Sequence, residues 1–397
     1  MKSMRSMALA VLTALLLSSS LPANAAAEDW LLPKTSEGPA FADTAGVWCE
    51  PEIAVVCQAG LMAGKSADRF DAQAPLTYAQ ITVITARLHA LLNGQDGALP
   101  AAGAEEAWYQ PALSLLEAEC ADPDVQSILK GFSDPAFPDS PCTRRSFALL
   151  LSGVLTEPLP AINDVDRVPD SVDPAVLALY NAGILTGSDA YGTFDEDGTL
   201  NRGQAAAMLA RLVDPSLRQR FTLEPFDLCA DVLGLAPETV VLTVGGAPVT
   251  AAEFANDLCT ALHQAGGGSR TALDSAIHTW CFYTAPFQVL AEEKDLSLTE
   301  EEVDQTAQYA AHYDGYLGLD AAYWLRKDTG VLLSGKLNDL YCQADWKAGT
   351  AYYHQDLDKT SQTLLEGAVI EPALESLDLA AVYRRLEASP FILWNFS

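Results

Sequence analysis

The stretch that decides the fold is residues 162–213, INDVDRVPDSVDPAVLALYNAGILTGSDAYGTFDEDGTLNRGQAAAMLARLV. Its apolar residues Val176, Leu179 and Tyr180 fall three and four positions apart, which places them in one stripe along a helix. A loop that contains glycine follows, and AAAMLARLV then predicts a second helix. Asn201 precedes this second helix, where its side chain can cap the exposed backbone donors. The stretch therefore predicts a helical hairpin.

The same order of elements occurs three times in the N-terminal half. In the first copy Phe70 precedes Leu76 by six positions, and in the last copy Phe194 precedes Leu200 by six. The middle copy is less regular and contains an inserted loop. One hairpin cannot cover its own apolar face, so three copies must pack together. We expect the copies at residues 41–93, 104–156 and 161–214, with Thr77, Thr143 and Asn201 as caps of their second helices.

The copies share one order of motifs: FxD, Trp, an apolar helix, GIxxG, FxP and a TRAE-like box. This order resembles the S-layer homology repeat, whose usual module has three copies. The resemblance implies a three-pronged spindle with a central helical bundle and grooves between the repeats. Modules similar to this one bind secondary cell-wall polysaccharide, often a polymer that bears negatively charged pyruvylated sugars. Three positions depart from the pattern: Tyr78 replaces the box arginine of the first copy, Cys120 replaces a helix-ending glycine, and Ser171 replaces a tryptophan. The change at Tyr78 leaves open whether the first copy binds glycan.

The resemblance also implies a set of glycan-binding residues. These are Asp43, Trp48, Trp108, Arg144, Asp164 and Arg202. Arg144 and Arg202 would lie at helix N-termini, where a guanidinium group and free backbone N–H groups can both receive a carboxylate. Two alternatives stay open, because arginines often form surface ion pairs and tryptophans are often core residues.

Charge restricts the class of partner. The chain has 23 basic and 53 acidic residues and a formal net charge of −30, so its surface repels nucleic acid and anionic lipid. An anionic partner must therefore be held by a local group of Arg or Lys side chains. The acidic sequence FDEDG lacks the ligand spacing of an EF-hand. The sequence also contains no C-x-x-C pair of the kind that indicates a zinc site. We expect no nucleic-acid partner, metal or cofactor.

The first 25 residues have the three parts of a secretory signal. Lys2 and Arg5 precede an apolar run, and the small residues at 23–25 follow it. A transmembrane anchor is the alternative, but the apolar run is only about half of the roughly 20 residues that span a bilayer. We expect a secreted protein at the cell wall or S-layer surface, with a signal peptide at residues 1–25 and no membrane span.

The chain has eight cysteines, all after the expected signal peptide. An even number in an exported chain predicts disulfides, for example between Cys120 and Cys142. Cys49 and Cys57 cannot be partners if they share one helix, since they would lie about 12 Å apart along its axis.

The C-terminal half has a different pattern. After a linker at 215–237, residues 238–397 begin with a short apolar strand, a Gly-Gly turn, a second strand and a helix with a Thr250–Glu253 capping box. Residues 238–350 resemble the N-terminal chaperone module of SurA-type and PrsA-type foldases. The segments that carry this resemblance are VVLTVGGAPVTAAEF and AEEKDLSLTEEEVDQ. That module shelters apolar segments of client proteins, for which Trp280, Phe282 and Phe287 are candidates, although a core role is the alternative.

The sequence predicts a mainly α fold, with a three-repeat helical spindle followed by a mostly helical SurA-like domain that contains a small β element. The expected function is non-covalent anchoring to secondary cell-wall polysaccharide, with a chaperone-like domain whose partners are unfolded secreted proteins. The 47 residues after Thr350 cannot hold a parvulin domain, so we expect no prolyl isomerase activity and no enzyme. The alternatives are a purely structural S-layer protein and, less favoured, a hydrolase of wall polymer.

Overall fold

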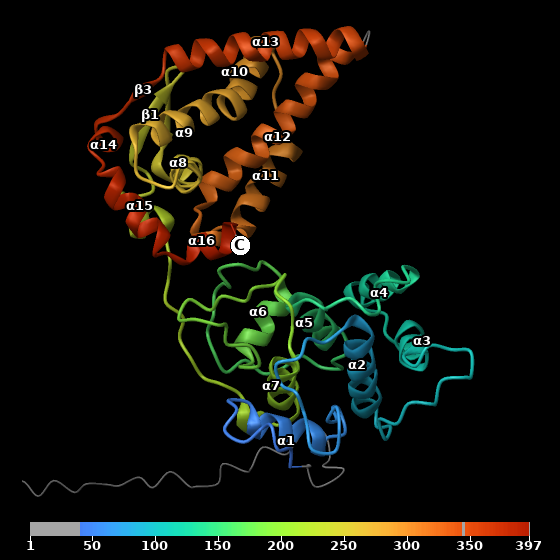
Figure 1. The fold of residues 1–397 in the computed structure, drawn as a ribbon. Helices are drawn as coiled ribbons and strands as arrows, with labels where there is room; N and C mark the ends of the chain where they lie inside the picture. The colour runs from blue at the N-terminus through green and yellow to red at the C-terminus, as the bar shows by residue number, and fades with distance from the viewer. Residues whose placement is uncertain (1–39, 344–345, 397) are drawn as a thin grey trace, which may run out of the picture.

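The computed structural model describes residues 40–343 and 346–396, so the predicted signal peptide lies outside the described residues. The described chain is mainly helical with a small three-stranded sheet, and the predicted fold class is confirmed. Figure 1 shows helices α1–α7 in one body and β1 with α8–α16 in another. Each body has its own buried apolar core, and a smaller third core lies within the second body.

The N-terminal body consists of three helical hairpins. Its helices are α1 (Glu50–Gln58), α2 (Tyr78–Leu92), α3 (Gln110–Glu119), α4 (Pro123–Lys130), α5 (Arg144–Gly153), α6 (Pro174–Asn181) and α7 (Arg202–Val213). The first helix of each hairpin packs on the second helix of another hairpin: α1 on α7, α3 on α2, and α6 on α5. The hairpins are therefore linked in a closed cycle, and α4 lies in the inserted loop of the middle copy.

A ring of three backbone hydrogen bonds lies at the centre of this cycle. The amide of Leu76 donates to the carbonyl of Leu200, that of Leu200 to Cys142, and that of Cys142 to Leu76, at 3.0, 3.1 and 2.9 Å. All three side chains are fully buried. Buried peptide groups must be paired, and the ring pairs one donor and one acceptor from each hairpin.

The ring leads directly into the second helices. The Thr77, Thr143 and Asn201 side chains accept hydrogen bonds from the backbone N–H groups of Gln80, Ser146 and Gln204. The predicted caps are therefore confirmed. Because each cap fixes the direction in which its helix starts, the first residue of each helix is aimed at a neighbouring hairpin.

The predicted disulfides are wrong. All eight cysteines are free thiols, and seven of them are buried. Cys142 belongs to the central ring, whereas the thiol of Cys120 donates to the carbonyl of Gly153 at 3.4 Å. Burial raises the pKa of the Cys142 thiol to about 12, so it stays protonated as an apolar core group. The cysteines serve as separate core residues rather than as pairs.

The C-terminal body begins with an antiparallel sheet of strand order β2-β1-β3. The strands are β1 (Val240–Val244), β2 (Ala247–Thr250) and β3 (Val369–Ile370). The predicted capping box is present, since Thr250 and Glu253 satisfy each other's backbone N–H groups at the start of α8. The helices are α8 (Ala251–Ala265), α9 (Arg270–Tyr283), α10 (Ala285–Glu293), α11 (Glu300–His312), α12 (Ala321–Cys342), α13 (Trp346–Glu366), α14 (Pro372–Glu375), α15 (Leu379–Glu387) and α16 (Pro390–Phe396).

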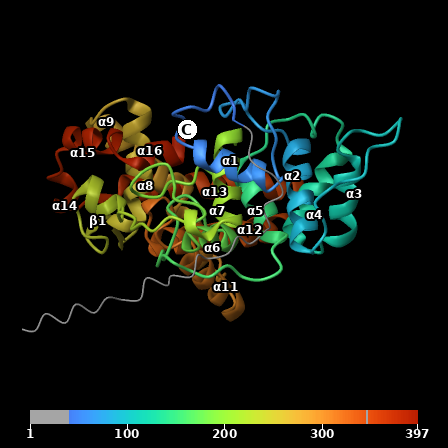
Figure 2. The ribbon, with the colours of Figure 1, turned by 90° about the horizontal axis from the view of Figure 1, so that it is seen from below.

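Short helical turns complete the described chain. They are three 3-10 helices at Gly131–Ser133, Pro215–Leu217 and Tyr316–Gly318, and a π-helix at Leu228–Leu233. Figure 2 shows α3 and α4 at one end of the molecule and β1, α14 and α15 at the other.

The two bodies touch through the third hairpin. The indole Nε1 of Trp394 donates to the hydroxyl of Thr193 at 2.8 Å, and the amide of Leu317 donates to the carbonyl of Pro169 at 2.7 Å. The Trp394 ring also packs edge-on against Phe226. The C-terminal body therefore contacts the hairpin that contains α6 and α7.

Candidate functional site

Two arginines link neighbouring hairpins in the same way. Arg144 and Arg202 are the first residues of α5 and α7. The Nε of Arg144 donates to the carbonyl of Phe194 at 2.5 Å, and the Nε of Arg202 donates to that of Phe70 at 2.9 Å. Each guanidinium also lies over the ring of the same phenylalanine, at 5.4 and 4.5 Å from the ring centroid. Each arginine thus contacts the loop of another hairpin rather than its own.

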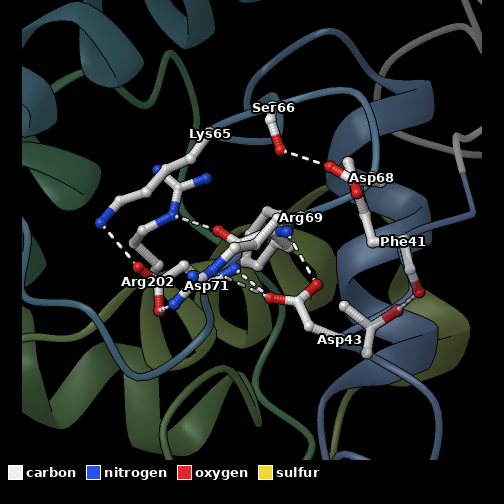
Figure 3. Close-up of polar contacts among 10 residues, drawn as sticks. Phe41, Asp43, Lys65, Ser66, Asp68, Arg69, Asp71 and Arg202 are labelled. Carbon is white, nitrogen blue, oxygen red and sulfur yellow. Dashed lines mark hydrogen bonds and ion pairs between the residues drawn. The ribbon is translucent and has the colours of Figure 1, made fainter.

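An aspartate holds each of these loops. The carboxylate of Asp43 accepts hydrogen bonds from the amides of Phe70 and Asp71, at 2.9 and 2.8 Å (Figure 3). In the third hairpin Asp170 accepts from Phe194 and Asp195 at 2.8 and 2.6 Å. Asp170, rather than the predicted Asp164, therefore occupies the position of Asp43.

Sequence reasoning missed Asp170, although a signal was present. VPD at 168–170 corresponds to FAD at 41–43, and both Val168 and Phe41 are buried. Asp164 instead lines a separate cavity beside Phe221 and Phe226.

The electrostatics of the two loop-holding carboxylates differ. The N–H group of Phe70 holds the pKa of Asp43 below its usual range, whereas burial raises the pKa of Asp170. In the first hairpin Arg69 lies 3.3 Å from one carboxylate oxygen of Asp71 and 3.9 Å from Asp43. Figure 3 draws these side chains together with Arg202.

Arg144 and Trp48 line a cavity of about 330 Å³, which we call the Trp48 groove. Gly187, Gln204 and Arg211 also line it, and its lining residues include no aspartate or glutamate. The Trp48 side chain is 57% exposed, so it is not the core residue that was considered as an alternative. The structure thus brings two of the six predicted residues together in one groove with a positive lining.

The donors of the Trp48 groove are only partly used. Within the described residues, the Arg144 guanidinium has its hydrogen bond through Nε, and its two Nη atoms have no acceptor in reach. Arg211 donates from Nη1 to the carbonyl of Ile184 at 3.1 Å, but its buried Nε has no partner in the same part of the chain. The Arg144 guanidinium can therefore offer donors to a ligand that enters the groove, and Arg211 adds a second positive charge to the lining.

Arg211 was not among the predicted residues. It lies nine positions after Arg202 on α7, just as Arg87 lies nine positions after Tyr78 on α2, and Gly153 stands there on α5. Arg87 donates to the carbonyl of Leu61 at 3.3 Å, the counterpart of the bond from Arg211 to Ile184. The repeated triplet ARL was the signal in the sequence.

Arg202 has a different environment from Arg144. It is 8% exposed, and its Nη2 donates to the carbonyl of Ala63 at 2.6 Å in addition to the bond from Nε. Burial lowers its pKa. The bond to Ala63 occupies a donor that is free in Arg144, so Arg202 joins two parts of the first hairpin's loop.

The ion-pair alternative does not describe either arginine. Neither Arg144 nor Arg202 lies within 4.0 Å of a carboxylate oxygen among the described residues, whereas Arg145 pairs with Asp173 at 3.0 Å. Trp108 is 57% exposed and packs edge-on against Tyr109, outside the Trp48 groove.

The remaining hairpin junction has an aromatic contact in place of the arginine. Tyr78, the first residue of α2, stacks on Phe137 with ring centroids 4.0 Å apart. Its hydroxyl lies 3.1 Å from the Ser146 hydroxyl. Tyr78 thus keeps the contact between hairpins but supplies no positive charge.

In the C-terminal body the aromatic candidates separate. Trp280 is 4% exposed and packs in the core, as the alternative interpretation expected. Phe282 stacks on His278 with centroids 4.1 Å apart, and Phe287 packs beside the smaller core. No group of metal-ligating side chains occurs in the described ranges. None of the helices at 40–343 or 346–396 combines the length and apolar character needed to span a bilayer.

Comparison of the chain with protein families matches residues 40–82 to the S-layer homology domain. No curated protein and no solved structure matches the chain. The match lies in the first hairpin, so the assignment of the later two copies and the foldase resemblance of residues 238–350 remain predictions. Residues 40–82 thus form an S-layer homology domain, which suggests anchoring to wall polysaccharide at a cell surface.

Proposed function

We propose that this protein is anchored non-covalently to secondary cell-wall polysaccharide and that the Trp48 groove is its binding site. The observation that supports the proposal most is the meeting of Trp48, Arg144 and Arg211 in one cavity whose lining has no acidic side chain. The formal net charge of the chain is −30, so a positive cavity is a local exception on an acidic protein. The S-layer homology match in residues 40–82 supports a wall polysaccharide as the ligand.

The free donors fit an anionic sugar. The two Nη atoms of Arg144 can bind both oxygens of a carboxylate, such as that of a pyruvylated sugar, in the forked geometry that arginine prefers. The positive charge of Arg211 in the same lining adds electrostatic attraction for such a group. The exposed Trp48 ring offers an apolar face against which the C–H groups of a sugar ring can pack.

The closed cycle of hairpins supports three S-layer homology copies at 41–93, 104–156 and 161–214. Each hairpin supplies one residue to the central ring and one helix to each neighbouring hairpin. The lining of the Trp48 groove comes from all three hairpins: Trp48 just before α1, Arg144 of α5, and the 184–188 loop with α7 of the third hairpin. A groove of this kind requires all three copies.

The proposal places the chain outside the cell, at the wall or S-layer surface. The pattern of a secretory signal in residues 1–25 supports export. Anchoring through a groove requires no covalent bond to the wall, so a competing soluble glycan should release the protein.

For residues 238–397 we propose a non-catalytic chaperone-like role toward unfolded secreted proteins, on the strength of the sequence resemblance alone. The alternative is a purely structural surface protein. The burial of Trp280 favours this alternative, because a buried ring cannot contact a client protein. Hydrolysis of wall polymer is a third option without a recognisable catalytic motif in the sequence. Light scattering of an unfolding client with added full-length protein separates the first two, since a structural protein leaves aggregation unchanged.

Co-sedimentation with purified wall sacculi tests the anchoring proposal. We expect the protein to sediment with intact sacculi and to stay in solution after the attached polysaccharide is removed chemically. Addition of the released polysaccharide should also compete the protein off intact sacculi. Equal binding to stripped and intact sacculi would contradict the proposal, because the ligand would then be the peptidoglycan itself.

A further inference from the structure

One loop of the third hairpin contacts both the Trp48 groove and the C-terminal body. We call residues 186–194 the groove loop. Its first three residues, 186–188, line the groove. Its last residue, Phe194, accepts the hydrogen bond from Nε of Arg144. The groove loop is also hydrogen-bonded to α16, the last described helix, which lies beside the N-terminal body in Figure 1.

Trp394 of α16 contacts the groove loop through both its N–H group and its ring. The indole Nε1 donates to the hydroxyl of Thr193 at 2.8 Å, and Thr193 is 7% exposed. The indole ring packs edge-on against Tyr191 of the same loop and against Phe226, with ring centroids 6.4 and 5.4 Å apart. The C-terminal body therefore fixes a buried residue of the groove loop.

Thr193 is hydrogen-bonded to the rest of the groove loop. Its carbonyl accepts from the amide and the hydroxyl of Ser188, at 3.0 and 3.3 Å. Its hydroxyl and its amide donate to the two carboxylate oxygens of Asp189, at 2.6 and 3.1 Å. The next residue, Phe194, holds Arg144 through its carbonyl. Two residues of the groove lining, Ser188 and Arg144, are therefore held at Thr193 or directly beside it.

The matching loop of the first hairpin is held by its own side chains. Arg69, which precedes Phe70, lies 3.3 Å from a carboxylate oxygen of Asp71. In the third hairpin Thr193 occupies this position before Phe194, and the groove loop contains no lysine or arginine. A contact from the other body thus stands in the third hairpin where the first hairpin has an internal ion pair.

We propose that Trp394 is a positioning residue for the Trp48 groove, because it holds the groove loop in the arrangement in which Arg144 and Ser188 line the groove together. This inference rests on the glycan-binding function proposed for the groove. The C-terminal body then supports the glycan site, although none of its described residues lines the groove. The coupling acts in both directions, because a ligand that favours the ordered loop also favours the contact that orders it.

Substitution of Trp394 by phenylalanine keeps an aromatic ring and removes the N–H donor. We expect Trp394→Phe in the full chain to weaken binding of the released wall polysaccharide about two- to tenfold, the range for the loss of one neutral hydrogen bond. Isothermal titration calorimetry measures the affinity. The matched control is Trp346→Phe, which should bind as the wild type does, because Trp346 is 66% exposed on α13 and does not line the groove.

Variants of Thr193 test the same hydrogen bond from its other end. Thr193→Ser keeps the acceptor and should bind the polysaccharide as the wild type does. Thr193→Val removes the hydroxyl at nearly constant volume and should weaken binding at least as much as Trp394→Phe. Added to Thr193→Val, Trp394→Phe should cause no further loss, since the bond is already absent. A further loss of the same size would overturn the proposal, and circular dichroism verifies the fold of each variant.

Hydrogen–deuterium exchange of the groove loop without glycan separates this inference from the function on which it rests. The amides of Ser188, Gly192 and Thr193 are hydrogen-bonded within the loop, and we expect Trp394→Phe to speed their exchange about two- to tenfold. Unchanged exchange overturns the positioning role, and so does faster exchange with an unchanged affinity for the polysaccharide. A wild type that binds no polysaccharide contradicts the function proposed for the groove instead, and faster exchange in Trp394→Phe would then still show that Trp394 holds the loop.

Discussion

The backbone amide of Leu76 donates to the carbonyl of Leu200 at 3.0 Å, which joins the first and third hairpins at the centre of the N-terminal body. Both side chains are fully buried. Cys142 of the middle hairpin completes the ring, because its amide donates to the carbonyl of Leu76 and its carbonyl accepts from the amide of Leu200. The ring determines where α2, α5 and α7 begin, and therefore which loop each helix N-terminus meets.

Truncation of a ring residue should be costly. We expect Leu200→Ala to lower the free energy of unfolding of the N-terminal body by about 2–5 kcal/mol, the range for a large-to-small change in a tight core. Urea denaturation followed by circular dichroism measures the change. Glu105→Ala, at an exposed position of the same body, is the control and should change stability by less than about 0.5 kcal/mol.

Arg144 and Arg145 form a matched pair of variants for the Trp48 groove. Arg144→Ala removes the free guanidinium donors, and we expect retention on wall polysaccharide to fall about tenfold or more, as loss of charge-assisted hydrogen bonds predicts. Arg145 lies next to it, pairs with Asp173 and does not line the groove. Arg145→Ala should retain binding, and equal losses in both variants would remove the assignment of Arg144.

Arg202 should act mainly on stability. Its substitution by alanine leaves the carbonyls of Phe70 and Ala63 without their donors, and a buried unsatisfied group costs on the order of 1–3 kcal/mol. We expect Arg202→Ala to lower the midpoint of urea unfolding more than Arg144→Ala does. A variant that is as stable as the wild type but fails to bind glycan would show instead that Arg202 contacts the ligand.

Asp43 should make the N-terminal body sensitive to acid. Hydrogen bonds from the backbone, the Phe70 amide first, lower the pKa of Asp43 in the folded state below the usual value of 3.8. The stability that this carboxylate contributes is therefore complete above pH 3.8 and is lost as the pH falls through the lowered pKa. Asp43→Asn should be less stable than the wild type at neutral pH, and the difference should shrink below that value. Asp139→Asn, at an exposed position of the same body, is the control and should change the stability at neutral pH by less than about 0.5 kcal/mol.

Thiol labelling tests the correction on disulfides. Cys342 is the partly exposed cysteine, and the other seven are buried. A thiol-specific reagent should modify Cys342 first in the native protein and all eight cysteines after denaturation without a reductant. Fewer than eight modified residues in the denatured protein, counted by mass spectrometry, would demonstrate a disulfide.

Local features were predictable because they depend on neighbours in the chain. The helical hairpins follow from apolar spacing, as at Val176 and Leu179, and both residues are buried. The caps at Thr77 and Asn201 follow from hydrogen bonds that span three residues. The β element and the Thr250 capping box in the second body are of the same kind.

The contacts and burial of individual site residues could not be predicted in this way. Arg144 and Arg202 occupy the same position of their helices, yet Arg144 faces an open groove and Arg202 is buried against Ala63. The difference comes from the loop that each arginine meets, which belongs to another hairpin.

The sequence by itself determined the hairpins, their caps and the number of times the pattern occurs, because these depend on propensities and hydrogen bonds within a few residues. Only the tertiary structure decided that Trp48 meets Arg144 and Arg211, that Asp170 rather than Asp164 holds a loop, and that the cysteines stay unpaired. The physical reason is the closed cycle of hairpins, in which each helix packs on a helix from another copy, so the site is made of residues far apart in the chain.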